Sequence, residues 1–309
     1  MVKRTLYFGN PAYLSLHLQQ LLIKLPEVER NTTLPDVFKA DQHRTIPLED
    51  IGIVVLDHPR ITLSQALMSQ LMSHQCVLVC CNDQHLPISM MVPSLGNTTF
   101  SERFQAQIDA SIPLKKQLWQ QTVAAKIENQ ARVLQHKNIG VKNMLAWAQN
   151  VKSADRDNLE ARAAVYYWAE LFREITDFTR GRDQIPPNNL LNYGYAILRA
   201  IVARCLVVSG LNTTIGIYHH NKYNAYCLAD DIMEPYRPYV DRLVTDIVAS
   251  RADINTLSKE LKIQLLAIPT LDVQINGQRS PLQVAVAQTT ASLAKCYLGT
   301  SRKIIYPIV

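Results

Sequence analysis

The strongest constraint on the fold is a change of sequence pattern close to residue 100. Before it, short apolar runs such as Ile51 to Leu56 and Cys76 to Cys81 are separated by turn-forming residues, which is typical of a small β-sheet. After it, apolar residues recur at helical spacing, as from Leu114 to Gln135, where no glycine occurs. A chain of 309 residues is long enough for two cores. We therefore predict an α+β protein with a β-rich domain at residues 1–100 and an all-α domain at residues 101–309.

Each helix expected in the second domain combines an apolar stripe with a turn-forming residue near one end. The expected ranges are 102–110, 114–135, 141–153, 156–177, 189–210, 238–250, 255–263 and 282–298. In the first domain, Thr62 or Ser64 can cap a helix that continues to about His74. The last residues, 299–309, can either dock or fray.

Charge is divided unevenly between the two parts. Residues 1–100 contain 7 Lys and Arg against 8 Asp and Glu, whereas residues 101–309 contain 25 against 18. Such an excess suits contact with nucleic-acid phosphates, although ordinary solubility charge explains a modest excess equally well. The first residues lack the apolar core of a signal peptide, and no apolar run reaches membrane-spanning length. We therefore expect a cytoplasmic protein with no membrane partner.

The stretch from Gly216 to Asp241 holds two adjacent histidines and the acids Asp230, Asp231 and Glu234. If a helix begins just before these acids, Asp231 and Glu234 share one face and Asp230 points elsewhere. An imidazole beside two carboxylates would make a mixed nitrogen and oxygen site for Mg²⁺ or Mn²⁺. A helix cap with surface acids explains the same spacing, so the spacing leaves both interpretations open.

Glu160 is a further candidate ligand. At helical spacing it shares a stripe with small and aromatic residues, namely Ala163, Ala164, Tyr167 and Trp168. An unpaired buried carboxylate is costly, so a glutamate on this stripe needs a partner, and a metal ion is one. The alternative is a solvated glutamate in the first turn of a helix, where it is favourable to the helix dipole.

Five ordered segments of the sequence resemble one known family. They are Ile46 to Gly52, Lys126 to Gln130, Leu159 to Trp168, Pro187 to Tyr195, and Gly216 to His219 with Leu228 to Pro238. Together they are similar to the CRISPR-associated spacer-acquisition integrase, the universal adaptation endonuclease known as CRISPR-associated protein one. The resemblance covers nearly the whole chain and is greatest to systems with a single large effector nuclease.

The resemblance implies an N-terminal β-domain that mediates homodimerisation and a C-terminal all-α catalytic domain. It places the metal ligands at Glu160, His219 and Glu234, with Mg²⁺ or Mn²⁺ as the cofactor. Asp231 matches a further acidic position close to the metal and completes the predicted catalytic set. Ala161 stands where the family often has glycine, a small change that leaves the metal assignment in place.

The same resemblance implies an activity and partners. The protein would insert new spacers into a CRISPR array by attack of a DNA 3′-hydroxyl on a phosphodiester of the repeat. Its partners would be double-stranded DNA, both prespacer and repeat, a second copy of itself, and a dimer of the small CRISPR-associated protein two. The candidate phosphate contacts are Lys126, Arg132, Lys142 and Arg279.

Two other functions remain open for these residues. One is a catalytically silent DNA-binding scaffold, and the other is a plain metal-dependent DNA nuclease with no role in integration. His219 also has two possible roles, as a metal ligand or as a general base. No motif separates the nuclease from the integrase.

Overall fold

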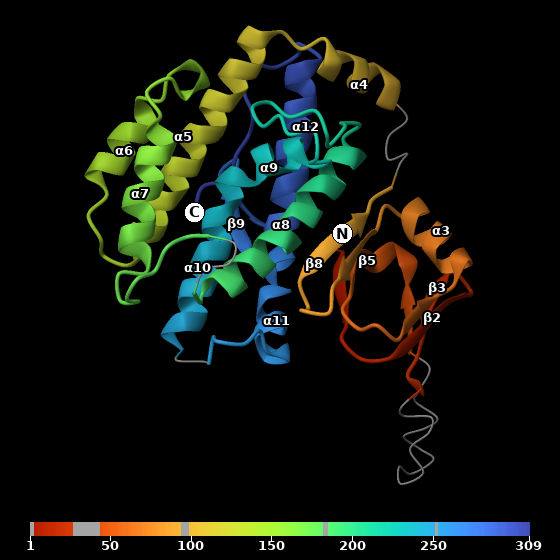
Figure 1. Cartoon of the computed structure of the whole chain (residues 1–309). Coiled ribbons are helices and arrows are strands. Elements are labelled where there is room, and N and C mark those ends of the chain that lie inside the picture. The colour runs from red at the N-terminus through yellow and green to blue at the C-terminus, as the bar shows by residue number, and fades with distance from the viewer. Residues whose placement is uncertain (1–2, 27–43, 94–98, 182–184, 251–252) are drawn as a thin grey trace. The chain divides into compact units, whose positions relative to one another are not determined.

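The computed structural model describes residues 3–26, 44–93, 99–181, 185–250 and 253–309. The chain folds into two compact units, residues 1–96 and residues 97–309. The first is rich in strands and runs from red to orange in Figure 1, while the second is mostly helical. This arrangement confirms the predicted α+β class.

Within its described residues, the first unit contains two four-stranded sheets, one α-helix and the short 3-10 helix η1 (Leu48–Asp50). One sheet has the order β1-β5-β7-β8, in which β8 alone is antiparallel, and the other has the order β4-β3-β2-β6. The strands are β1 (Arg4–Phe8), β2 (Ala12–His17), β3 (Gln20–Lys24), β4 (Arg44–Pro47), β5 (Ile51–Leu56), β6 (Ile61–Leu63), β7 (Val77–Cys81) and β8 (Pro87–Met91). Strands β5 and β7 are the two inner strands of the first sheet, and most of their residues are buried. Both strands therefore appear in the sequence as continuous apolar runs.

The helix of the first unit, α3 (Gln65–Ser73), lies close to its predicted position. Ser64 is its cap, since the serine Oγ accepts a hydrogen bond from the backbone N–H of Leu67 at 3.3 Å. Leu67 and Leu71 are buried in one cluster with strand residues such as Leu14 and Val54. The apolar stripe of the helix therefore builds the core of this unit.

The second unit is organised around its two longest described helices, α5 and α8, both of which are rich in buried residues. Its helices are α4 (Phe100–Ile108), α5 (Ile112–His136), α6 (Lys142–Gln149), α7 (Leu159–Leu171), α8 (Asn188–Val208), α9 (Cys227–Met233), α10 (Arg237–Ala249), α11 (Lys259–Leu265) and α12 (Leu282–Tyr297). Short 3-10 turns occur at η2 (Ser153–Asp155), η3 (Glu234–Tyr236) and η4 (Ile268–Thr270). Helix α5 packs against α6, α7, α10 and η3 (Figure 1).

Helix α8 is a core helix. It packs against α9, α10, α11 and α12. Among the described residues it is the one helix long and apolar enough to cross a membrane, yet 72% of its apolar window is buried inside the protein. Its hydrophobicity is therefore accounted for by packing, and the cytoplasmic location stays a prediction.

The expectation of an all-α second domain is wrong in one respect. Strands β9 (Asp272–Ile275) and β10 (Gln278–Pro281) form an antiparallel hairpin. Its turn residues, Asn276 and Gly277, have φ angles of 51° and 72°. Both values lie in the left-handed region that an Asn-Gly hairpin turn uses, so this dipeptide was the signal that the helical prediction passed over.

Three predicted helix boundaries differ from the structure by four residues or more. The helix expected at 141–153 ends at Gln149. The helix containing Glu160 ends at Leu171 rather than near Asp177, because Phe172 leaves the helical conformation and packs against Trp168 and Phe178. The helix expected from residue 255 begins four residues later. It starts at Lys259, after Ser258 caps it by accepting from the N–H of Leu261 at 3.3 Å.

Residues 299–309 dock on the second unit. The N–H of Ile305 donates to Ser292 Oγ at 2.9 Å, and that of Ile308 donates to the Gln274 carbonyl at 2.8 Å. Val309 N–H donates to Asn129 Oδ1 at 3.1 Å. Of the two predicted alternatives, docking is the one observed.

Candidate functional site

Three buried or half-buried charged side chains from separate elements meet in the second unit. Lys126 lies near the middle of α5, Glu160 in the first turn of α7, and Glu234 at the start of η3. The packing of α5 against α7 and η3 brings them together. We call these three residues, together with Arg237, the acid site.

The Lys126 ammonium stands between the two carboxylates. Its Nζ donates a hydrogen bond to Glu160 Oε1 at 2.6 Å and forms an ion pair with Glu234 Oε2 at 2.7 Å. The side chains of Lys126, Glu160 and Glu234 are 13%, 23% and 5% exposed. The structure thus joins two of the predicted ligands, and it places Lys126, expected as a phosphate contact, inside the acid site.

Positive charge on two sides keeps Glu234 ionised. Arg237 lies with its guanidinium 3.1 Å from Glu234 Oε1. Burial alone would raise the pKa of Glu234, but the charges of Arg237 and Lys126 outweigh it and hold this pKa below its ordinary value. Burial would likewise lower the pKa of Lys126, whereas Glu234 and Glu160 leave it above its ordinary value. Both partners are therefore charged at neutral pH.

Glu160 is positioned by a cap that the sequence analysis missed. Asp155 accepts hydrogen bonds from the N–H groups of Leu159 and Glu160, each at 2.9 Å, and so begins α7. An acid in a first turn is favourable to the helix dipole, as one interpretation held. Glu160 is nevertheless paired with Lys126 rather than freely solvated. A second acid, Asp157, lies close to Asp155 in the sequence, and the spacing alone does not indicate which of the two caps α7.

Asp231 organises the loop that carries His219. Its Oδ2 accepts hydrogen bonds from the N–H groups of Ile217 at 2.6 Å and Tyr218 at 3.0 Å, and its Oδ1 accepts from the N–H of His219 at 3.2 Å. A Cβ at Gly216 would stand 2.4 Å from the His219 carbonyl oxygen, so only glycine fits there. Asp231 therefore fixes the backbone on which the histidine stands.

The same carboxylate holds the imidazole of His219. Nδ1 lies 2.6 Å from Asp231 Oδ1, and because a carboxylate only accepts, Nδ1 carries the hydrogen. This bond raises the pKa of His219 against the lowering effect of burial, with further increments from the charges of Asp231, Glu234 and Glu160. The side chain is 46% exposed, and Nε2 is the ring nitrogen left for another partner. A carboxylate behind a histidine is the usual support of a metal ligand.

Aromatic packing supports the loop from the side of α5. The ring of Tyr218 stacks on the buried Trp119 with centroids 4.3 Å apart and planes within 3°. The His219 ring meets the same Trp119 edge-on at 5.7 Å. These contacts fix the ring plane of the histidine next to the acid site.

The surface interpretation of the three adjacent acids is wrong. Asp230, Asp231 and Glu234 are all buried. Asp230 receives two hydrogen bonds from the Arg199 guanidinium at 2.6 and 2.8 Å and one from Asn224 at 2.7 Å. Its role is structural.

The donor chemistry fits a hard divalent ion. In the described part of the chain, no three His, Cys, Asp or Glu side chains stand close enough together to hold a metal. Glu160 and Glu234 nevertheless share one cation, the Lys126 ammonium. Two carboxylates and the free nitrogen of His219 are ligands that Mg²⁺ and Mn²⁺ accept.

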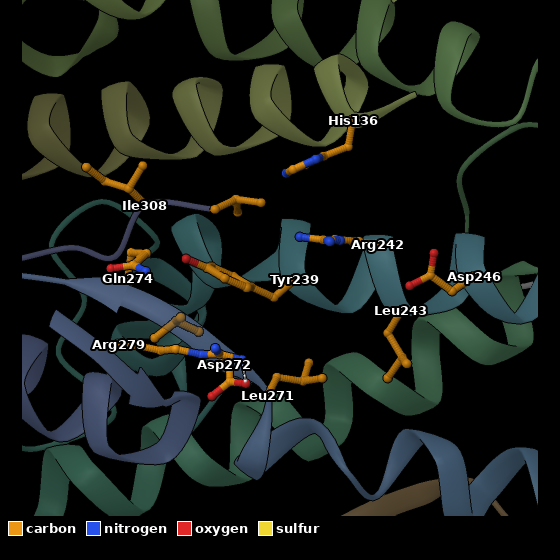
Figure 2. A pocket seen from close by; sticks show the side chains of 12 residues that line it. His136, Tyr239, Arg242, Leu243, Asp246, Leu271, Asp272, Gln274, Arg279 and Ile308 are labelled. Carbon is orange, nitrogen blue, oxygen red and sulfur yellow. Dashed lines mark hydrogen bonds and ion pairs between the residues drawn. The ribbon is translucent and has the colours of Figure 1, made fainter. Parts of the chain in front are cut away.

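A separate hollow of about 520 Å³ opens between α10, the β9–β10 hairpin and the end of α5 (Figure 2). Figure 2 shows His136 and Arg242 reaching toward it from α5 and α10. Arg279, one of the expected phosphate contacts, lies on its wall in an ion pair with Asp272. No acid-site residue lines it.

The other expected phosphate contacts are scattered. Arg132 pairs with Glu128 within α5 at 2.9 Å. Lys142 is exposed at the start of α6. The structure therefore gathers the predicted acids and histidine in one region, and it does not gather the four predicted cations.

Comparison with known sequences identifies a family. The sequence profile described as CRISPR associated protein Cas1 matches residues 10–258. The chain is 34% identical over 289 residues to the CRISPR-associated endonuclease Cas1 of Neisseria meningitidis, which covers 93% of this chain and 89% of the relative. It is 28% identical over 267 residues to a CRISPR-associated endonuclease Cas1 of Pyrobaculum aerophilum, a match that covers 82% of this chain and 89% of the relative.

Solved structures share the fold. A casposase bound to its integration product superimposes with a TM-score of 0.75 at 19% identity, over 98% of this chain and 92% of that one. A CAS1 protein from Thermotoga maritima superimposes with a TM-score of 0.74 at 15% identity, over 96% of this chain and 97% of that one. These likenesses concern the fold, whereas the profile match and the 34% identity decide the family. The chain belongs to the Cas1 family of CRISPR-associated proteins.

Proposed function

We propose that this protein is a metal-dependent DNA integrase and endonuclease of CRISPR adaptation, which inserts new spacers into an array. The observation that carries the proposal is the pair Glu160 and Glu234, which contact one cation, the Lys126 ammonium, while Asp231 holds His219 nearby. Family membership and relatives that are named endonucleases support the nuclease chemistry. The casposase bound to an integration product supports strand joining.

Glu160, Glu234 and His219 Nε2 would hold Mg²⁺ or Mn²⁺. When bound, such an ion activates a hydroxyl and offsets the charge that develops on the attacked phosphate. Asp231 keeps the imidazole in the tautomer that leaves Nε2 free, and Arg237 holds Glu234 by its other oxygen.

The reaction is a transesterification. The 3′-oxygen of the incoming strand forms a bond to a phosphorus of the repeat, and the bond from that phosphorus to the repeat 3′-oxygen breaks. The attacking hydroxyl gives up its proton to solvent, and the leaving oxygen takes one up. One phosphodiester replaces another, so the step needs no added energy source.

The proposed partners are double-stranded DNA, a second copy of the chain, and a Cas2 dimer. The basic excess of residues 101–309 supports contact with DNA phosphates. A Cas6-RT-Cas1–Cas2 complex contains a chain with the same fold, with a TM-score of 0.72 over 98% of this chain, 36% of that chain and 19% identity. The presence of Cas2 in that complex supports the Cas2 partner.

A strand-transfer assay tests the proposal. Purified protein and Cas2 are mixed with a labelled duplex bearing free 3′-hydroxyls, a repeat-containing plasmid and Mn²⁺. We expect wild type to join the strands, and Glu160→Gln and His219→Ala to lose about 100-fold or more in rate. The matched controls are Glu128→Gln, a glutamate on α5 paired with Arg132, and His220→Ala, the adjacent exposed histidine.

Each other outcome has a definite meaning. Cut but unjoined strands would replace the integrase with a plain nuclease. DNA binding without cutting or joining would make the protein a silent scaffold. Joining that survives Glu160→Gln or His219→Ala would remove that residue from the proposed metal site.

A further inference from the structure

We propose that the Lys126 ammonium is a tethered counter-ion, which occupies the divalent-ion position between Glu160 and Glu234 in the metal-free protein and leaves it when an ion binds. This inference rests on the proposed function, because it assumes that the two acids are metal ligands. It adds a residue that sets the metal affinity of the site.

The first argument is the geometry of the two carboxylates. Nζ lies 2.6 Å from Glu160 Oε1 and 2.7 Å from Glu234 Oε2, so one cationic nitrogen contacts both acids. A Mg²⁺ or Mn²⁺ ion held by these two acids would need the oxygens that now contact Nζ. An ammonium and a divalent ion held by the same oxygens would repel each other strongly in a site from which water is largely excluded. The two cations therefore exclude each other.

The second argument is a contrast with the other cation of the acid site. Arg237 contacts Glu234 through Oε1, at 3.1 Å, and leaves Oε2 to Lys126. The Arg237 contact can therefore persist beside a bound ion, whereas the Lys126 contact cannot. Lysine also suits the exchange, since its compact charge sits on a flexible four-carbon chain.

The third argument is the cost of leaving the acids alone. Two carboxylates brought together in a mostly buried site destabilise the fold unless a positive charge accompanies them. Lys126 supplies that charge from within the chain. Lys126 thus stabilises the paired carboxylates in the metal-free protein, and a divalent ion must displace its ammonium to bind there.

Metal binding by lysine variants tests this inference. Isothermal titration of the full chain with Mn²⁺ near pH 7.5 compares wild type with Lys126→Met, which keeps the length of the side chain and removes its charge. We expect Lys126→Met to bind Mn²⁺ at least about tenfold more tightly, because no ammonium then competes with the ion for the carboxylates of Glu160 and Glu234. Lys126→Arg keeps a competing charge and should gain none of this affinity. Lys116→Met, an exposed lysine on the same helix, is the matched control and should bind like wild type.

Thermal unfolding gives a second readout. In chelator, Lys126→Met should unfold at a lower temperature than wild type, and Mn²⁺ should raise its unfolding temperature by more than it raises that of wild type. If Lys126→Met does not fold, Lys126→Gln makes the same test with a neutral side chain.

The outcomes separate this inference from the proposed function. Equal or weaker Mn²⁺ binding by Lys126→Met, with clear binding by wild type, overturns the inference and leaves the metal site standing. Absence of Mn²⁺ binding in wild type and every variant overturns both.

Discussion

Two buried carboxylates of the second unit, Glu234 and Asp241, lie seven residues apart and behave in opposite ways. Glu234 is 4% exposed and Asp241 is 1% exposed. Glu234 contacts the charged groups of Lys126 and Arg237, which hold its pKa below the ordinary value. Burial instead raises the pKa of Asp241 to about 6.

The difference lies in the partners. Asp241 accepts hydrogen bonds from two neutral hydroxyls, Tyr195 at 2.5 Å and Tyr167 at 2.9 Å, and these lower its pKa without offsetting burial. Hydroxyls satisfy the lone pairs of a carboxylate, but a cation in contact also compensates its charge. The acid site provides cations in direct contact with Glu234, whereas the charges of Arg180 and Arg237 act on Asp241 without an ion pair among the described residues and do not offset its burial.

Removing the negative charge should cost far more at Glu234 than at Asp241. Glu234→Gln leaves the buried charges of Lys126 and Arg237 without one of their acids, and we expect a loss of about 3 kcal/mol in the free energy of unfolding in chelator. Asp241→Asn, the matched variant, should cost about 1 kcal/mol near neutral pH. Urea unfolding followed by tryptophan fluorescence measures both, since Trp119, Trp147 and Trp168 all lie in the second unit. Equal losses of unfolding free energy in the two variants would contradict the contrast drawn between Glu234 and Asp241.

The pH dependence should follow Asp241. Its folded-state pKa of about 6 lies above the ordinary value of 3.8, so the folded state binds the proton more tightly. The stability that this contributes is fully present below the ordinary pKa and is lost as the pH rises through about 6. The stability of wild type relative to Asp241→Asn should therefore fall by about 2 kcal/mol between pH 4.5 and pH 7.5. A difference independent of pH would place the pKa of Asp241 in its ordinary range.

Removing one hydroxyl should sharpen the comparison further. Tyr195→Phe deletes a donor to the Asp241 carboxylate, and we expect a cost of about 1.5 kcal/mol near pH 7.5 together with a further rise in the pKa of Asp241. The control is Tyr297→Phe. The Tyr297 hydroxyl is buried and has no hydrogen-bond partner within the described residues, so its loss should be nearly neutral. A cost confined to Tyr297→Phe would contradict the assigned partners.

Most of the fold was predictable because its elements follow local patterns. The serine cap of α3 and the glycine-free run of α5 are recognisable without knowledge of the rest of the chain. The predictions failed where a local signal was overlooked or where tertiary contacts decided. The Asn276-Gly277 turn belongs to the first kind, and the early end of α7 at Phe172, which packs on aromatic neighbours, belongs to the second.

The candidate site was predictable in its residue types and less so in its contacts. Family resemblance proposed Glu160, His219 and Glu234 as metal ligands, and that assignment stays a prediction. The structure brings Glu160 and Glu234 into contact with one cation, Lys126. The role of Lys126 as the cation between the acids required knowledge of which helix faces which, since it lies 34 residues before Glu160. The support that Asp231 gives to the His219 loop likewise could not be read from the sequence, because it consists of hydrogen bonds from backbone N–H groups.

Helix α5 makes its functional contacts along a single line. Trp119, Thr122, Lys126 and Asn129 follow one another at intervals of three or four residues and meet, in turn, the His219 loop, Tyr306, the acid site, and the carbonyls of Pro235 and Pro307. Each added residue turns an α-helix by about 100° and lengthens it by about 1.5 Å. One inserted or deleted residue between Trp119 and Asn129 would rotate part of this line away from its partners. The length of this segment is therefore fixed by the partners along it, just as its buried side chains Val123 and Ile127 are fixed by packing.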